Sequence, residues 1–70
     1  MNKKRAEELA MKFVSDLMGR ELRMLGVKKS TRHEGKWGVI FERTTKEGHV
    51  IDGPMVVIVD ERTEEASLFH

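Results

Sequence analysis

Residues 53–66, GPMVVIVDERTEEA, decide how this chain folds. After the first two residues, five apolar residues follow one another without a polar break, and a polar, acidic segment comes next. A strand with one face in water alternates apolar and polar residues, so an unbroken apolar strand indicates that both faces are covered. Pro54 cannot donate to a sheet hydrogen bond and therefore marks the beginning of the strand. We predict a strand over about residues 55–60, a polar turn, and a short last strand over 65–69.

An amphipathic helix comes before the strands. One continuous apolar stripe at helical spacing is formed by Ala6, Leu9, Ala10, Phe13, Val14, Leu17 and Met18. Asn2 is suited to cap the start of this helix, and Gly19 to end it in a left-handed conformation. We predict a helix over about residues 3–18. A single amphipathic helix is marginal in water, so its stripe must pack on another element.

Residues 36–43, KWGVIFER, predict a strand that supplies the partner for the helix. Trp37, Val39 and Phe41 share one face of it, because side chains alternate between the faces of a strand. The connections between the predicted elements are short, which favours antiparallel hairpins. The predicted fold class is therefore α+β, with one N-terminal amphipathic helix packed on a three- to four-stranded antiparallel sheet.

The segment between the helix and this strand permits two interpretations. Leu22 and Leu25 could extend the helical stripe, whereas Leu22 and Met24 could be alternate residues of a strand. We expect a break near one of the glycines in residues 19–26, followed by an extended segment over about 27–32.

Length and composition place the chain among single small domains, here residues 1–70. It has 13 basic and 12 acidic residues, and a net charge of +1 gives no strong field toward nucleic acid or membrane. There is no cysteine, and charges interrupt the N-terminal region where a signal peptide would be apolar. We expect a cytoplasmic protein, although a mature part of an exported protein would have the same pattern.

The second face of the unbroken strand predicts an interaction surface. If alternate residues of both central strands face the helix, then Ile40, Val56 and Ile58 face away from it. Covering three aliphatic side chains would contribute about 1.5–3 kcal/mol each, which is large beside a domain stability on the order of 5 kcal/mol. We predict association through this face, most simply as a two-fold homodimer, because such dimers are the commonest assembly. Another protein partner is the alternative.

A basic cluster offers a second hypothesis. Lys28, Lys29, Arg32 and Lys36 could contact phosphates, and Trp37 and Phe41 could stack on bases. The two aromatics alternate with Val39 on the face that the helix needs, so burial is the better interpretation of both. Nucleic-acid binding through a basic hairpin is therefore the alternative function, and protein binding is the first.

The sequence contains no pattern typical of catalysis or of metal binding. His33, His49 and His70 have no partner at the spacing of a metal motif. The acidic turn after residue 59 lacks the glycine of a calcium loop. We expect no enzymatic activity, no cofactor and no metal.

Three segments resemble the small PepSY-type module: AEELAMKFV, KWGVIFER and VVIVDERTEEASLF. That family has a helix followed by an antiparallel sheet that ends in a V-x-V-D-x-x-T-G hairpin, and here Glu64 replaces the glycine. Gly53-Pro54 and Val59-Asp60 are similar to the pattern of the YrhB-related family of small immunity proteins. The resemblances imply non-catalytic protein binding, either inhibition or regulation of a protease or neutralisation of a partner, and they imply no catalytic residues.

Overall fold

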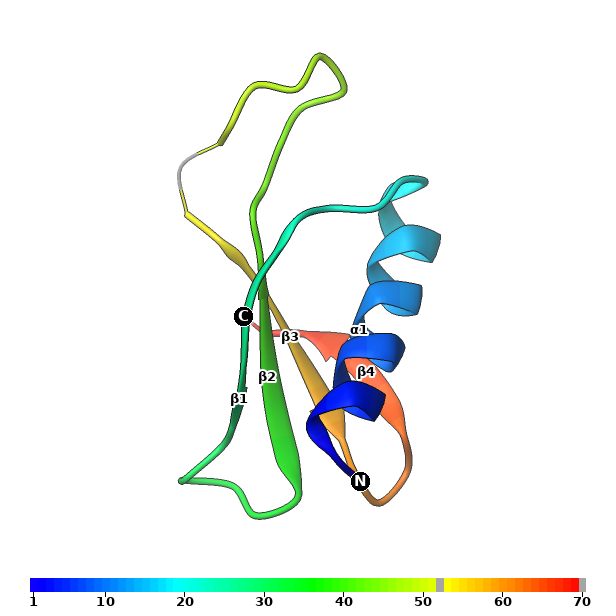
Figure 1. Ribbon diagram of the computed structural model, residues 1–70, viewed down its shortest axis with the longest axis vertical. Helices are drawn as coiled ribbons and strands as arrows, with labels where there is room; N and C mark the ends of the chain where they lie inside the picture. Colours follow the sequence, from blue (N-terminus) through cyan, green and yellow to red (C-terminus); the bar gives the residue numbers. More distant parts are fainter. Residues whose placement is uncertain (52, 70) are drawn as a thin grey trace.

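The computed structural model of the chain describes residues 1–51 and 53–69. Neighbouring strands pair antiparallel in the order β1-β2-β3-β4, and α1 packs against all four of them. Figure 1 shows the helix lying along one side of the sheet. The predicted α+β fold is confirmed, with four strands. The elements are α1 (Lys3–Met18), β1 (Met24–Lys29), β2 (Lys36–Phe41), β3 (Met55–Asp60) and β4 (Glu65–Leu68).

Local signals at both ends determine the extent of α1. The side chain of Asn2 accepts a hydrogen bond from the Arg5 backbone N–H at 2.9 Å, which satisfies one of the free donors of the first turn. Gly19 adopts a φ of 73° and donates its N–H to the Ser15 carbonyl, so the helix ends in a left-handed cap. The helix has the predicted bounds.

The core lies between α1 and one face of the sheet. Along β3, fully buried residues alternate with half-buried ones, and the fully buried set faces the helix. This alternation places every second residue of the unbroken strand away from α1. The core cluster consists of Ala10, Val14, Leu22, Val39, Phe41, Met55, Val57 and Val59.

The expected first strand, 27–32, was misplaced, since β1 spans Met24–Lys29. Its end comes earlier because Ser30 begins the turn: the Ser30 hydroxyl oxygen accepts from the His33 N–H, and Gly35 has a φ of 80°. Its beginning comes earlier because Met24 already pairs with Phe41 of β2. The open question about residues 20–26 is thus answered in favour of a strand.

The expected ends of two other strands were each slightly too long. β2 ends at Phe41 rather than at residue 43, because the chain then leaves the sheet for a long connection to β3. β4 ends at Leu68 rather than at residue 69. The β2–β3 connection extends beyond the C-terminal end of α1 (Figure 1) and is closed by a bridge between Thr44 and Val50. The Arg20 guanidinium donates to the Thr44 carbonyl and attaches this connection to the segment after the helix.

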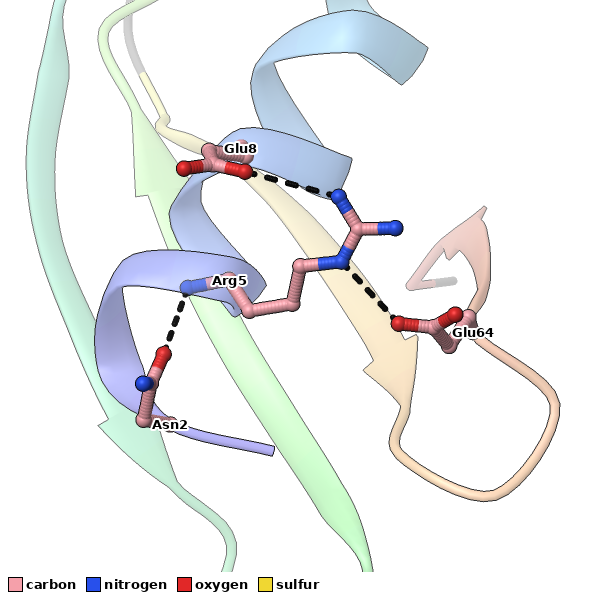
Figure 2. Close-up of polar contacts among 4 residues, drawn as sticks. All are labelled: Asn2, Arg5, Glu8 and Glu64. Carbon is pink, nitrogen blue, oxygen red and sulfur yellow. Dashed lines mark hydrogen bonds and ion pairs between the residues drawn. The ribbon is translucent and has the colours of Figure 1, made fainter.

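The β3–β4 hairpin is joined to α1 by an ion pair. The Arg5 Nε donates to the Glu64 carboxylate at 3.0 Å, and Glu8 is a second, longer partner of Arg5 (Figure 2). The hydrogen bond from Arg5 lowers the pKa of the Glu64 carboxyl and raises the pKa of the Arg5 guanidinium. Among the described residues, Glu64 is also the one non-glycine residue with a positive φ, 57°. The position where the PepSY pattern has glycine therefore has a backbone conformation that favours glycine.

Replacement of Phe41 should leave most of the molecules unfolded. The side chain is fully buried, with 0% exposed, and Phe→Ala changes in cores cost about 3–5 kcal/mol. This is comparable to a domain stability on the order of 5 kcal/mol. Urea denaturation followed by circular dichroism should show Phe41→Ala largely unfolded in buffer. Leu17→Ala, which truncates a helix side chain that is 50% exposed, is the control and should retain a native transition. A native transition in Phe41→Ala would contradict the described packing.

The hairpin conformation at Glu64 should be detectable in the same assay. Glu64→Gly relieves the left-handed backbone strain but removes the ion pair with Arg5. An exposed ion pair contributes little to stability, so we expect the urea midpoint to rise. Glu64→Gln keeps the strain and removes the charge, so its midpoint should fall slightly. If Glu64→Gly were less stable than the wild type, the ion pair would outweigh the strain.

Candidate functional site

The candidate site is the face of the sheet opposite α1. The structure places Ile40 of β2 and Val56 and Ile58 of β3 on this face, where all three are half-buried. Their neighbours in the strands, such as Val39 and Val57, are fully buried beneath the helix. The difference in burial arises because one helix covers only one side of the sheet.

Strand pairing arranges the side chains of this face in three rows across the sheet. Alternate Cα partners share a face, so the register defines each row. The first row contains Lys36, Asp60 and Glu65; the second contains Lys28, Gly38, Ile58 and Ser67; the third contains Gly26, Ile40 and Val56. Phe69 extends the third row, because its N–H donates to the Val56 carbonyl at 2.9 Å.

Exposed apolar side chains collect around the third row. Leu25, Val50, Ile51 and Phe69 are between 44% and 66% exposed. All four line one of two hollows that meet at Ile40. Only two other large apolar side chains of the described residues are comparably exposed, Met1 and Leu17. We call this surface the apolar back face: Leu25, Ile40, Val50, Ile51, Val56, Ile58 and Phe69.

The larger hollow, ≈ 430 Å³, includes one strand position without a side chain in its lining. Gly38 lines it, and Gly26 lies beside Ile40 in the third row. Neither glycine has a positive φ, and a Cβ added at Gly38 would come no closer than 3.9 Å to the Lys28 carbonyl oxygen. A Cβ at Gly26 would have no neighbour within 4 Å. Glycine in a strand costs roughly 0.5–1 kcal/mol relative to alanine, and no neighbouring atom in the folded chain requires it here.

The four residues of the basic cluster do not form one patch. Lys28 points to the back face, and Arg32 lies in the exposed turn that borders the larger hollow. Lys29 pairs with Trp37, and its ammonium lies 5.8 Å from the centre of the indole ring. Lys36 forms an ion pair with Asp60 at 2.9 Å. The structure thus brings three of the four residues, Lys28, Lys29 and Arg32, to the lining of the larger hollow, whereas Lys36 is paired with Asp60.

Trp37 is half-buried, and its surroundings favour a structural role over base stacking. It lies on the helix side of the sheet, where it packs against the core cluster. Its indole N–H donates to the Glu61 carboxylate at 2.8 Å. This hydrogen bond holds the ring against the end of the β3–β4 hairpin.

Charge is unequally distributed along the first row. Lys36 lies on β2, whereas Asp60 and Glu65 lie on β3 and β4. The hydrogen bond from Lys36 lowers the pKa of the Asp60 carboxyl, and the Arg62 backbone N–H contributes further. The row is therefore basic toward β1 and acidic toward β4.

The edges of the sheet are less suitable than its face for binding another chain. A register shift between Met24 and Gly26 leaves Leu25 as an extra residue in β1, and such a bulge interrupts regular pairing. The opposite edge, β4, has only four residues. The face is the more extensive surface.

The described part of the chain has no group of three or more His, Cys, Asp or Glu side chains that could hold a metal ion. His33 and His49 are exposed in turns, and His70 lies outside the described residues. The acidic turn that begins at Asp60 is a hairpin in which the Glu64 N–H donates to the Asp60 carbonyl. Within residues 1–51 and 53–69, no helix has the length and apolarity required to cross a membrane.

Comparisons with models of protein families, with curated proteins and with solved structures found no match to this chain. The resemblances to PepSY-type modules and to small immunity proteins therefore stay expectations. The candidate site depends on geometry alone.

Sequence reasoning missed four members of the apolar back face. Phe69 could have been found by continuing the alternation of β4, since Ala66 and Leu68 face the core and the next residue must face away. Leu25 could not, because its position follows from the bulge in β1. Val50 and Ile51 belong to a connection without strand periodicity, and no local pattern marks their proximity to Ile40.

Proposed function

We propose that this chain is a small, non-catalytic protein-interaction module that binds another polypeptide chain through the apolar back face. The observation that carries the proposal is the collection of exposed apolar side chains around Ile40, opposite α1. A contiguous exposed apolar surface is typical of a protein-binding site. An inhibitor, immunity or regulatory factor would use such a surface, in agreement with the two family resemblances, and we place its action in the cytoplasm.

A charge placed in the centre of the face should abolish binding. Ile58→Lys puts an ammonium group on the apolar back face, and Leu17→Lys makes the same kind of change at an exposed apolar residue of α1. Loss of an isoleucine contact of about 1.5–3 kcal/mol corresponds to roughly 10- to 150-fold weaker binding. A tagged chain, cross-linked in the cells that encode it, should retain the same bound chain in the wild type and in Leu17→Lys and lose it in Ile58→Lys.

Two controls make this result decisive. Circular dichroism must show native spectra for both lysine variants, and untagged copies of the chain itself must be quantified among the bound proteins. Equal retention by Ile58→Lys and Leu17→Lys would contradict the proposed function, because binding would then not depend on the back face.

Nucleic-acid binding is a second candidate, supported by the position of Lys28 and Arg32 beside Phe69 at the larger hollow. Lys36 is paired with Asp60 and Lys29 lies over Trp37, so both cations already have partners within the chain. This favours the first proposal. Phosphate contacts are strongest at low salt. We therefore expect no retardation of single-stranded RNA or duplex DNA in a low-salt mobility shift. Retardation that is lost in a Lys28→Ala, Arg32→Ala double variant would favour nucleic acid instead.

A further inference from the structure

We propose that the chain which covers the apolar back face is a second copy of this protein, related by a two-fold axis that runs parallel to the strands between β2 and β3. This inference rests on the proposed function and specifies its partner. It depends on two features of the face: the positions of its strand glycines and the distribution of its charges.

The proposed axis fixes which residues meet. A two-fold axis parallel to the strands lays β2 of one copy over β3 of the other, and β1 over β4. Each row of side chains then lies over the same row of the partner. Packed sheets rotate by about 30° relative to each other, so the match is closest at β2 and β3, next to the axis.

Large side chains meet positions without side chains in this arrangement. In the second row, Gly38 lies opposite the partner's Ile58, and by symmetry Ile58 lies opposite the partner's Gly38. In the third row, Ile40 lies opposite the partner's Val56, and Gly26 opposite the partner's Phe69. Strand glycines mark places where another chain approaches closely. Ile58 is thus complementary to the space over the partner's Gly38, and Phe69 to the space over the partner's Gly26.

Opposite charges also meet. In the first row, Lys36 lies opposite the partner's Asp60, and Asp60 opposite the partner's Lys36. The ion pair already present within each copy and that of the partner then form a square of alternating charge. Glu65 lies over the end of the partner's β1, where the exposed turn that contains Arg32 begins.

The other two-fold arrangement with aligned strands fits less well. An axis perpendicular to the strands, between the second and third rows, would lay Ile58 over the partner's Val56 and Gly26 over the partner's Lys28. Asp60 would lie over the partner's Pro54 and would have no cation opposite it. The axis parallel to the strands instead places Gly38 opposite the partner's Ile58, Phe69 opposite Gly26 and Lys36 opposite Asp60.

The size of the face determines the expected affinity. Four strands about 4.8 Å apart and six residues of about 3.3 Å each cover a surface of roughly 15 by 20 Å. Stable dimers bury about 800 Å² on each partner, so the strands alone make a small interface. The apolar residues of the β2–β3 connection, Val50 and Ile51, extend it at one end. We expect a dissociation constant in the micromolar range.

Gly38→Val tests the contact without weakening the folded chain. A Cβ at this position meets nothing closer than 3.9 Å within one copy, and valine favours strands, so the melting temperature should be unchanged or higher. In the dimer, valine collides with the partner's Ile58. Sedimentation velocity over a concentration series should show a dimer for the wild type and for Leu17→Lys. Gly38→Val should weaken association by about 10-fold or more.

A mixture of two single variants tests which residues face each other. In Gly38→Val homodimers the added side chain collides twice, and in Ile58→Ala homodimers two contacts are lost. A heterodimer of the two variants places the introduced valine over the introduced alanine at one contact and keeps the native pair at the other. If all pairings were equally stable, an equimolar mixture would contain as much heterodimer as both homodimers combined. Native mass spectrometry should therefore show more heterodimer than this. A share no greater than this would overturn the proposed axis.

The outcome for the pure chain separates this inference from the proposed function. A wild-type chain that stays monomeric up to about 1 mM would overturn the second copy as the occupant. If, in that case, the wild-type chain captured a different protein and Ile58→Lys did not, the proposed function would stand with a heterologous partner. If Ile58→Lys lost nothing, both proposals would fail.

Discussion

The structure depends on one constraint: a single helix has to bury a four-stranded sheet that has apolar residues on both faces. Small residues on α1, Ala6 and Ala10, are fully buried against the sheet, and the side chains of β2 and β3 that point toward the helix form the core. No such cover exists for the other face within the described residues. The apolar side chains of that face are therefore left half-buried or exposed, at a cost that grows with the area that water contacts.

The parts of the fold that local chemistry determines could be predicted from the sequence. The helix bounds follow from Asn2 and Gly19, and the beginning of β3 follows from Pro54, because caps and prolines act on their own backbone. The beginning of β1 could not be predicted, since Leu22 and Leu25 fit helical spacing and Leu22 and Met24 fit extended spacing. Pairing of Met24 with Phe41, far along the chain, decides it.

The candidate site likewise has features that local patterns predict and features that depend on contacts distant in sequence. Strand alternation placed Ile40, Val56 and Ile58 on one face. It also shows why adjacent lysines of the basic cluster point to opposite faces, but the ion pair that engages Lys36 requires the β2–β3 register. Which side chains gather around Ile40 depends on a bulge and on a long connection, and both are set by contacts distant in sequence.

The strand glycines carry the strongest argument that the single chain is not the complete structure. A glycine is expected where the backbone has a positive φ or where a neighbouring atom leaves no space for a Cβ. At Gly38 and Gly26 neither reason applies within one copy, and both positions weaken strands that a 70-residue domain needs. A second chain against the face would supply the missing reason, because the space that these glycines leave open is then occupied from outside. The weak points of the isolated fold and the proposed points of contact are thus the same residues.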